Sequence, residues 1–143
     1  MDCQYCIEIS VKSIHKIIGR KYQTNSHGLE FGHGDTQEFT NNIPADFTHE
    51  NKVPRAIFLT QFWDTFYELS KYGAPKVDKD PEDIFHWRDA ERAIEDATFC
   101  LNLAFHLLDY AVDTYEIDDP RPDPSNLELN LTIDPYSLDY EQK

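Results

Sequence analysis

A seven-residue repeat of apolar side chains between residues 81 and 116 constrains this chain more than any other feature. Alanine recurs at positions 90, 97, 104 and 111, and a larger apolar side chain recurs at 94, 101, 108 and 115. The alternating gaps of four and three place both series along one face of a helix. Asp80 suits the N-cap, Pro81 the first helical position and Asp83 the capping box. The sequence therefore predicts one continuous helix over residues 81–116.

The two series differ in size, and this difference predicts how the helix packs. An alanine in every heptad allows a second backbone to approach more closely than the usual ~8–10 Å between helix axes. We expect Ala104 to lie at this close contact, where a leucine would force the two elements apart. We expect Asp96 to lie off the contact and to tolerate a leucine better.

A second, strongly aromatic helix is predicted over residues 54–72, between Pro54 and Gly73. The link of residues 74–79 is short, so the two helices should form an antiparallel hairpin. At 1.5 Å per residue the first helix is roughly 28 Å long and the second roughly 54 Å. The second half of the long helix must therefore be buried against the N-terminal segment, a sheet, or a second copy of the chain.

Residues 5–18 fit two interpretations. Ile7, Ile9 and Val11 alternate as in a strand, whereas Ile7, Val11, Ile14 and Ile18 share a helical face. The β-branched side chains favour a strand over about 5–11, followed by a short helix ending at Gly19. The pattern alone does not decide between strand and helix.

The segment LELNLTI, residues 127–133, alternates cleanly and predicts a strand that needs a pairing partner. The predicted fold class is therefore α+β and mainly helical, with a small sheet from the N-terminal and C-terminal strands beside the helix hairpin. We expect one domain over residues 1–143. It contains a glycine- and histidine-rich loop region at 20–53, and a proline-rich connector, strand and tail at 117–143.

The net charge of −14 limits the classes of partner. It argues against direct binding to nucleic acid or to an anionic membrane, since both carry the same sign, and it favours a basic protein partner. Neither a leader-like segment nor an apolar run of about 20 residues is present in the sequence, which predicts a cytoplasmic protein without a membrane span. Three cysteines, an odd number, argue against a disulfide framework.

The acidic excess is greatest near the C-terminal end of the long helix. Asp109, Asp113 and Glu116 recur on one helical face, and Asp118 and Asp119 follow directly. Carboxylates at a helix C-terminus oppose the helix dipole, at ~0.3–1 kcal/mol each. These five acids are either a solvated helix end or an electronegative face that docks a basic surface, for example by imitating DNA phosphates.

Metal and catalytic alternatives have weaker support. Cys3 and Cys6, together with His27 and His33, contain metal-ligating side chains, but a zinc site needs four ligands at a recognisable spacing. Asp83-x-x-His86 has the carboxylate-x-x-His spacing of helical-bundle metal sites, yet only one copy is present. No nucleophile-elbow motif surrounds a serine or cysteine. We therefore expect no metal, no cofactor and no enzymatic activity.

Three functions follow in order of preference. The first is a small acidic, non-enzymatic inhibitor of a basic nucleic-acid-handling protein, of the immunity, antitoxin or phage counter-defence type. The second is a metal-binding or enzymatic protein that uses the Cys3/Cys6 and His27/His33 region. The third is a structural homodimerisation module in which the alanine series pairs two copies. The uncovered half of the long helix and the unpaired strand at 127–133 both predict a homodimer.

Overall fold

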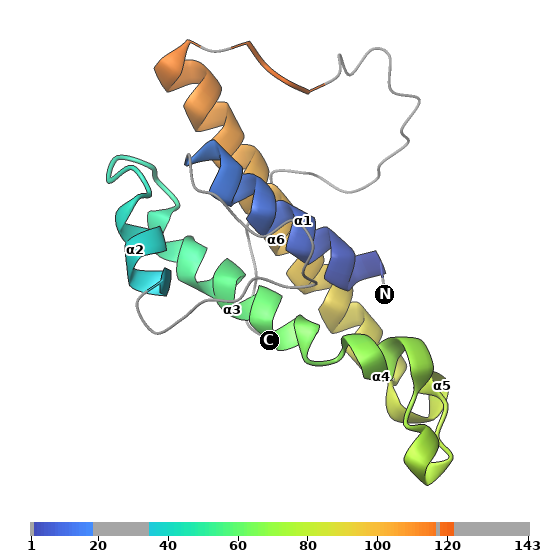
Figure 1. Cartoon of the computed structure of the whole chain (residues 1–143). Coiled ribbons are helices and arrows are strands. Elements are labelled where there is room, and N and C mark those ends of the chain that lie inside the picture. Colours follow the sequence, from blue (N-terminus) through green and yellow to red (C-terminus); the bar gives the residue numbers. More distant parts are fainter. Residues whose placement is uncertain (1, 19–34, 117, 122–143) are drawn as a thin grey trace.

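The computed structural model describes residues 2–18, 35–116 and 118–121 (Figure 1). In these ranges the chain is mainly helical. The α-helices are α1 (Asp2–Ile17), α2 (Asp35–Asn41), α3 (Val53–Asp64), α4 (Tyr67–Tyr72), α5 (Pro81–Ile84) and α6 (Trp87–Tyr115). Two short 3₁₀ helices connect them, η1 (Glu50–Lys52) before α3 and η2 (Pro75–Val77) after α4.

Helix α1 is the main partner of the long helix α6 and runs beside it in the same direction (Figure 1). Cys3 and Ala93 line one cavity near the start of both helices. Ile17 and Ala111 line another near their C-terminal ends. The N-terminal segment therefore covers the second half of the long helix, which was one of the three alternatives that the helix lengths allowed.

Three of the four alanines of the series lie where these two helices are in contact. Ala97, Ala104 and Ala111 are all buried. Ile7, Val11 and Ile14 of α1 are buried in the same core cluster as Ala97 and Ala104. Small side chains on α6 and β-branched side chains on α1 are complementary in shape, which permits dense packing. The contact is made within one chain, so these alanines are not available to pair two copies.

The large series, which the spacing places on the same helical face as the alanines, is not buried with them. Ile94 is 52% exposed and Tyr115 is 59% exposed, while Leu101 and Leu108 are only half-buried. The apolar side chains other than alanine that α6 does bury are those at positions 99, 100, 103 and 107. The buried face of α6 therefore lies on the side of the alanine series that is opposite to the large series, because α1 packs on that side.

The predicted strand at residues 5–11 lies within helix α1. Ile7, Val11 and Ile14, at gaps of four and three, are almost completely buried. Burial of this helical face outweighs the β propensity of the branched side chains. In the described ranges the only β pairing is an isolated bridge between Ala74 and Lys79. The α+β class with a small sheet is therefore wrong for this part of the chain. The predicted strand at 127–133 lies outside the described residues.

Both predicted helices are interrupted. The helix expected over 54–72 divides into α3 and α4, and the helix expected over 81–116 divides into α5 and α6. The expected capping box of Asp80 and Asp83 is present, but it begins only the short α5. Phe85 and His86 are extended, and a second capping box joins His86 to Asp89, whose Oδ2 accepts the His86 N–H at 2.8 Å. This second box begins the long helix.

The turn between α4 and α5 depends on Gly73. Its φ of +67° lies in the left-handed region, and a Cβ at this position would lie 2.2 Å from the backbone oxygen of Lys79. Helices α4 and α5 contact each other across this turn, with the rings of Phe66 and Phe85 6.1 Å apart. The expected hairpin thus closes at its tip, whereas along its length α6 contacts α1 more than α3.

A buried carboxylate connects α3 to α6. Asp96 is 1% exposed, and its Oδ2 accepts a hydrogen bond from the Trp63 indole N–H at 3.0 Å. Its carboxylate also lies 3.3 Å from Nε of Arg92 and 3.6 Å from Nη2 of Arg55. The expectation that Asp96 lies off the core and tolerates a leucine is therefore wrong, because the core at this point is polar.

Candidate interaction surface

The five predicted partner-binding acids lie at and just beyond the C-terminal end of α6. Asp109 and Asp113 lie on the last turns of the helix, and Glu116 is its C-cap in the left-handed conformation, with φ +50°. Asp118 and Asp119 follow in the connector. Asp109 is half-buried and the other four are exposed. The five acids are thus distributed over the last turns of α6, its C-cap and the connector.

Arg121 neutralises two of these five acids. Its Nη1 lies 2.7 Å from Asp109 Oδ1, and its Nη2 lies 2.6 Å from Asp119 Oδ2. Its Nε–H and its backbone N–H also donate to Asp119 Oδ1, at 2.8 and 2.9 Å. The guanidinium carbon lies 6.0 Å from the centre of the Phe105 ring. Arg121 thereby ties the connector back to α6.

These contacts shift the proton affinity of the groups that make them. Hydrogen bonds from the Arg121 side chain and backbone lower the pKa of Asp119 below its usual value. The side-chain hydrogen bond to Asp119 raises the pKa of Arg121, which is charged at neutral pH in any case. Asp119 is therefore an ion-pair partner within the chain rather than an open docking group.

The remaining three acids form the open part of the surface. Asp113, Glu116 and Asp118 are exposed and make no ion pair among the residues that the structure describes. Asp113 and Glu116 lie in the last turn, where the carbonyl ends of the helix already carry partial negative charge. We call Asp113, Glu116 and Asp118 the acidic tip. Local helix stability does not explain why three acids lie there.

A second polar cluster borders this surface and was not predicted from the sequence. The Tyr110 hydroxyl donates to Asp46 Oδ1 at 2.6 Å, and the rings of His49 and His106 lie 4.6 Å apart. The hydrogen bond to Asp46 raises the pKa of Tyr110. Burial is the main cause that lowers the pKa of His49, and repulsion from His106 and Lys52 lowers it further. Asp46 and Tyr110 are 64 positions apart, and no sequence spacing indicates such a contact.

The structure brings no metal site together among the described residues. Cys3 and Cys6 lie one turn apart on α1 and are half-buried, and burial raises the pKa of the Cys6 thiol. In this part of the chain no group of three or more His, Cys, Asp or Glu side chains is arranged to hold a metal ion. His27 and His33 lie outside the described residues.

The Asp83-x-x-His86 spacing does not form the expected metal-binding pair either. Asp83 lies on α5, whereas His86 is the N-cap of α6, so the two side chains do not share one helical face. Each of the two residues is instead part of a different capping box. The sequence pattern reflects two adjacent helix starts.

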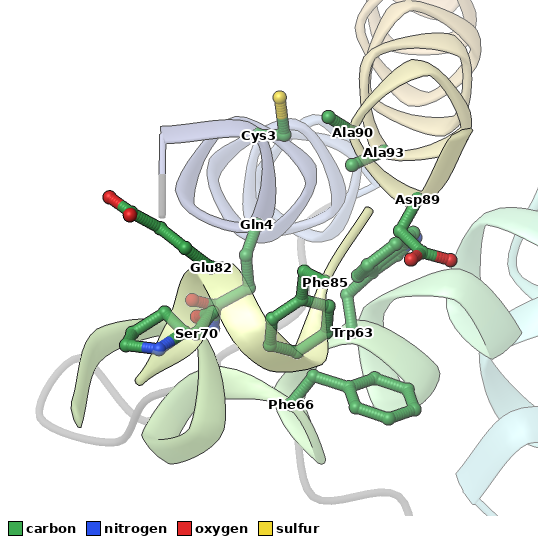
Figure 2. Close-up of a pocket in the computed structure, with 11 residues that line it drawn as sticks. Cys3, Gln4, Trp63, Phe66, Ser70, Glu82, Phe85, Asp89, Ala90 and Ala93 are labelled. Carbon is green, nitrogen blue, oxygen red and sulfur yellow. The ribbon is translucent and has the colours of Figure 1, made fainter. Parts of the chain in front are cut away.

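A cavity of about 280 Å³ lies at the other end of α6, between α1, α3, α4, α5 and the first two turns of α6. Figure 2 shows the side chain of Gln4 extending from α1 toward Phe85 and Ser70. Of the polar groups that line it, Asp89 is engaged with the His86 backbone. The Trp63 indole, also in the lining, is engaged with Asp96. The other described lining residues combine apolar side chains with the polar side chains of Gln4, Ser70 and Glu82.

Comparison with known proteins gives no assignment. No protein family, curated protein or solved structure matches the chain. Among the described residues, no helix combines the length and the apolar character that crossing a bilayer requires.

Proposed function

We propose that this protein is a non-enzymatic antagonist that docks a basic, nucleic-acid-handling protein through the acidic surface at the C-terminal end of α6. The observation that carries the proposal is the acidic tip. Asp113, Glu116 and Asp118 are exposed and unpaired among the described residues, at the helix end where the backbone dipole opposes negative charge.

Electrostatics supports a role in association. Clustered fixed charges attract an oppositely charged surface over a distance and raise the association rate more than they raise affinity. A protein that binds DNA phosphates presents the lysine and arginine surface that such a cluster fits. The net charge of −14 adds a favourable long-range field for the same partner.

The Arg121 bridge supports the proposal by ordering the surface. Its bonds to Asp109 and Asp119 hold the connector, which contains Asp118, beside the last turns of α6. A preorganised charge cluster loses less conformational entropy on binding than a flexible one. In this proposal Asp109 and Asp119 position the connector, and the acidic tip makes the contact.

The test begins with the full chain as bait in its native cells and with identification of the captured proteins. The association rate of the captured partner is then measured over a salt series. In the test variant, Asp113→Asn, Glu116→Gln and Asp118→Asn neutralise the tip and leave Arg121 bridged. A matched control carries Glu68→Gln, Asp78→Asn and Glu91→Gln, three exposed acids elsewhere on the molecule.

We expect the tip variant to associate more slowly than the wild-type protein at low salt and to lose most of the salt dependence. The Debye length falls from about 10 Å at 0.1 M salt to about 3 Å at 1 M, so wild-type association should slow over this range. The control has the same net charge as the tip variant and should behave like the wild-type protein. Equal rates for both variants, or the capture of no basic nucleic-acid-binding protein, would overturn the proposal.

A further inference from the structure

Helix α6 has a second apolar face that α1 does not cover. Every seventh residue along its whole length is a large apolar side chain, at positions 87, 94, 101, 108 and 115. Trp87 is 65% exposed, Ile94 52% and Tyr115 59%, with Leu101 and Leu108 half-buried between them. We call these five residues the outer stripe. A seven-residue repeat of this kind is typical of a helix that packs against another helix.

The length of the outer stripe limits what can cover it. At 1.5 Å per residue it extends about 42 Å, from the first residue of α6 to the last. The next longest described helix, α1, has 16 residues and is already packed on the alanine face. A partner helix that matches the full stripe must be as long as α6, and a second copy of the chain supplies one.

The outer stripe is also symmetric about its centre. Leu101 lies fourteen residues from either end of α6, with Ile94 and Leu108 at equal distances on each side and an aromatic ring at each end. Two such helices in antiparallel orientation bring Leu101 against Leu101, Ile94 against Leu108, and Trp87 against Tyr115. An isologous contact of this kind is self-complementary and closes as a dimer.

Charge favours the antiparallel orientation over the parallel one. In a parallel pair the two acidic tips would lie side by side and repel each other. In an antiparallel pair they lie at opposite ends, each beside the positive N-terminal end of the partner helix and its exposed Arg88. The flanking charges and the helix dipoles therefore select the same arrangement.

We propose that the outer stripe pairs two copies of the chain as an antiparallel α6–α6 homodimer. The contact is one helix wide, about 42 Å by about 10 Å, or roughly 400 Å² per copy, against about 800 Å² per partner in a typical stable interface. The dimer is accordingly reversible. Because each copy carries a charge of −14, added salt strengthens the dimer, the opposite of its effect on docking to a basic partner. The proposal does not depend on the proposed function.

Solution mass tests the dimer directly. Sedimentation of the full chain from low micromolar to near-millimolar concentration should show a mass rising from 16.7 kDa toward twice that value, at lower concentrations in high salt. Ile94→Glu should remain monomeric. Phe58→Glu on α3, which replaces a similarly exposed side chain outside the stripe, should dimerise like the wild-type protein. A monomeric wild-type protein throughout the range, or an Ile94→Glu variant that dimerises normally, would overturn the proposal.

Disulfide formation tests the orientation. In a background with Cys3→Ser and Cys6→Ser, an Ile94→Cys chain mixed with a Leu108→Cys chain should form a mixed disulfide under mild oxidation. An Ile94→Cys chain alone should not form an intermolecular disulfide, because the two copies of position 94 lie on opposite sides of the centre of the helix pair. Efficient self-linkage of Ile94→Cys without mixed linkage would show a parallel pair and overturn the antiparallel arrangement.

Discussion

The indole N–H of Trp63 donates a hydrogen bond to Asp96 Oδ2 at 3.0 Å and so joins α3 to the long helix α6. The carboxylate is buried, and Arg55 and Arg92 approach it from the two helices at 3.6 and 3.3 Å. Burial of a carboxylate is tolerated only where such partners replace its hydration. This polar junction fixes where α3 contacts α6.

Asp96→Ala should destabilise the fold by about 1–3 kcal/mol. The variant leaves the Trp63 N–H without this acceptor and removes the Asp96 carboxylate from the surroundings of Arg55 and Arg92. Asp96→Asn retains an oxygen acceptor for the indole and should cost less. Chemical denaturation measures both, with Glu91→Ala at an exposed position of the same helix as the control. Equal stability of Asp96→Ala and Glu91→Ala would contradict this role for the junction.

Ala104→Leu should destabilise the protein by about 1–3 kcal/mol, because the added methylenes have no space where α1 and α6 meet. Ala90→Leu is the matched control. It is the same substitution, in the same series and on the same helix, but Ala90 is exposed and should tolerate leucine with little change. Thermal unfolding of both variants measures the difference. Equal unfolding midpoints for the two variants would show that α1 and the alanine series are not in close contact.

Arg121→Gln should return the pKa of Asp119 toward its ordinary value of 3.8. In the wild-type fold the pKa is lowered, so the Asp119–Arg121 bridge stabilises the folded state at pH values above 3.8. That contribution is lost as the pH falls through the lowered pKa. Carbon-13 NMR titration of the Asp119 carboxyl measures the shift, with Arg88→Gln as a control that removes a distant arginine. An Asp119 pKa unchanged by Arg121→Gln would show that the connector is not bridged in solution.

The acidic surface illustrates the limits of prediction from a linear pattern. The positions of Asp109, Asp113 and Glu116 on one helical face follow from their spacing, and the structure places all three near the end of α6. The pairing of Asp109 and Asp119 with Arg121 does not follow from spacing, because it depends on the path of the connector after the helix. The expected five-residue surface is therefore divided into two bridged acids and an open tip of three.

By itself the sequence determined some of the helix boundaries, since these signals are local, but not the breaks between α3 and α4 or between α5 and α6. The Asp80 and Asp83 capping box begins α5, and Gly73 ends α4, as these local signals indicate. The start of the long helix at His86 was not indicated by the sequence. Tertiary structure decided what each helix buries. By pattern alone, residues 5–11 fit either a strand or a helix, and the packing of α1 against α6 selects the helix. The alanine series of α6 likewise did not indicate on which of its two sides a partner would pack. Burial depends on contacts between distant segments, which outweigh local propensities of a few tenths of a kcal/mol to about 1 kcal/mol per residue.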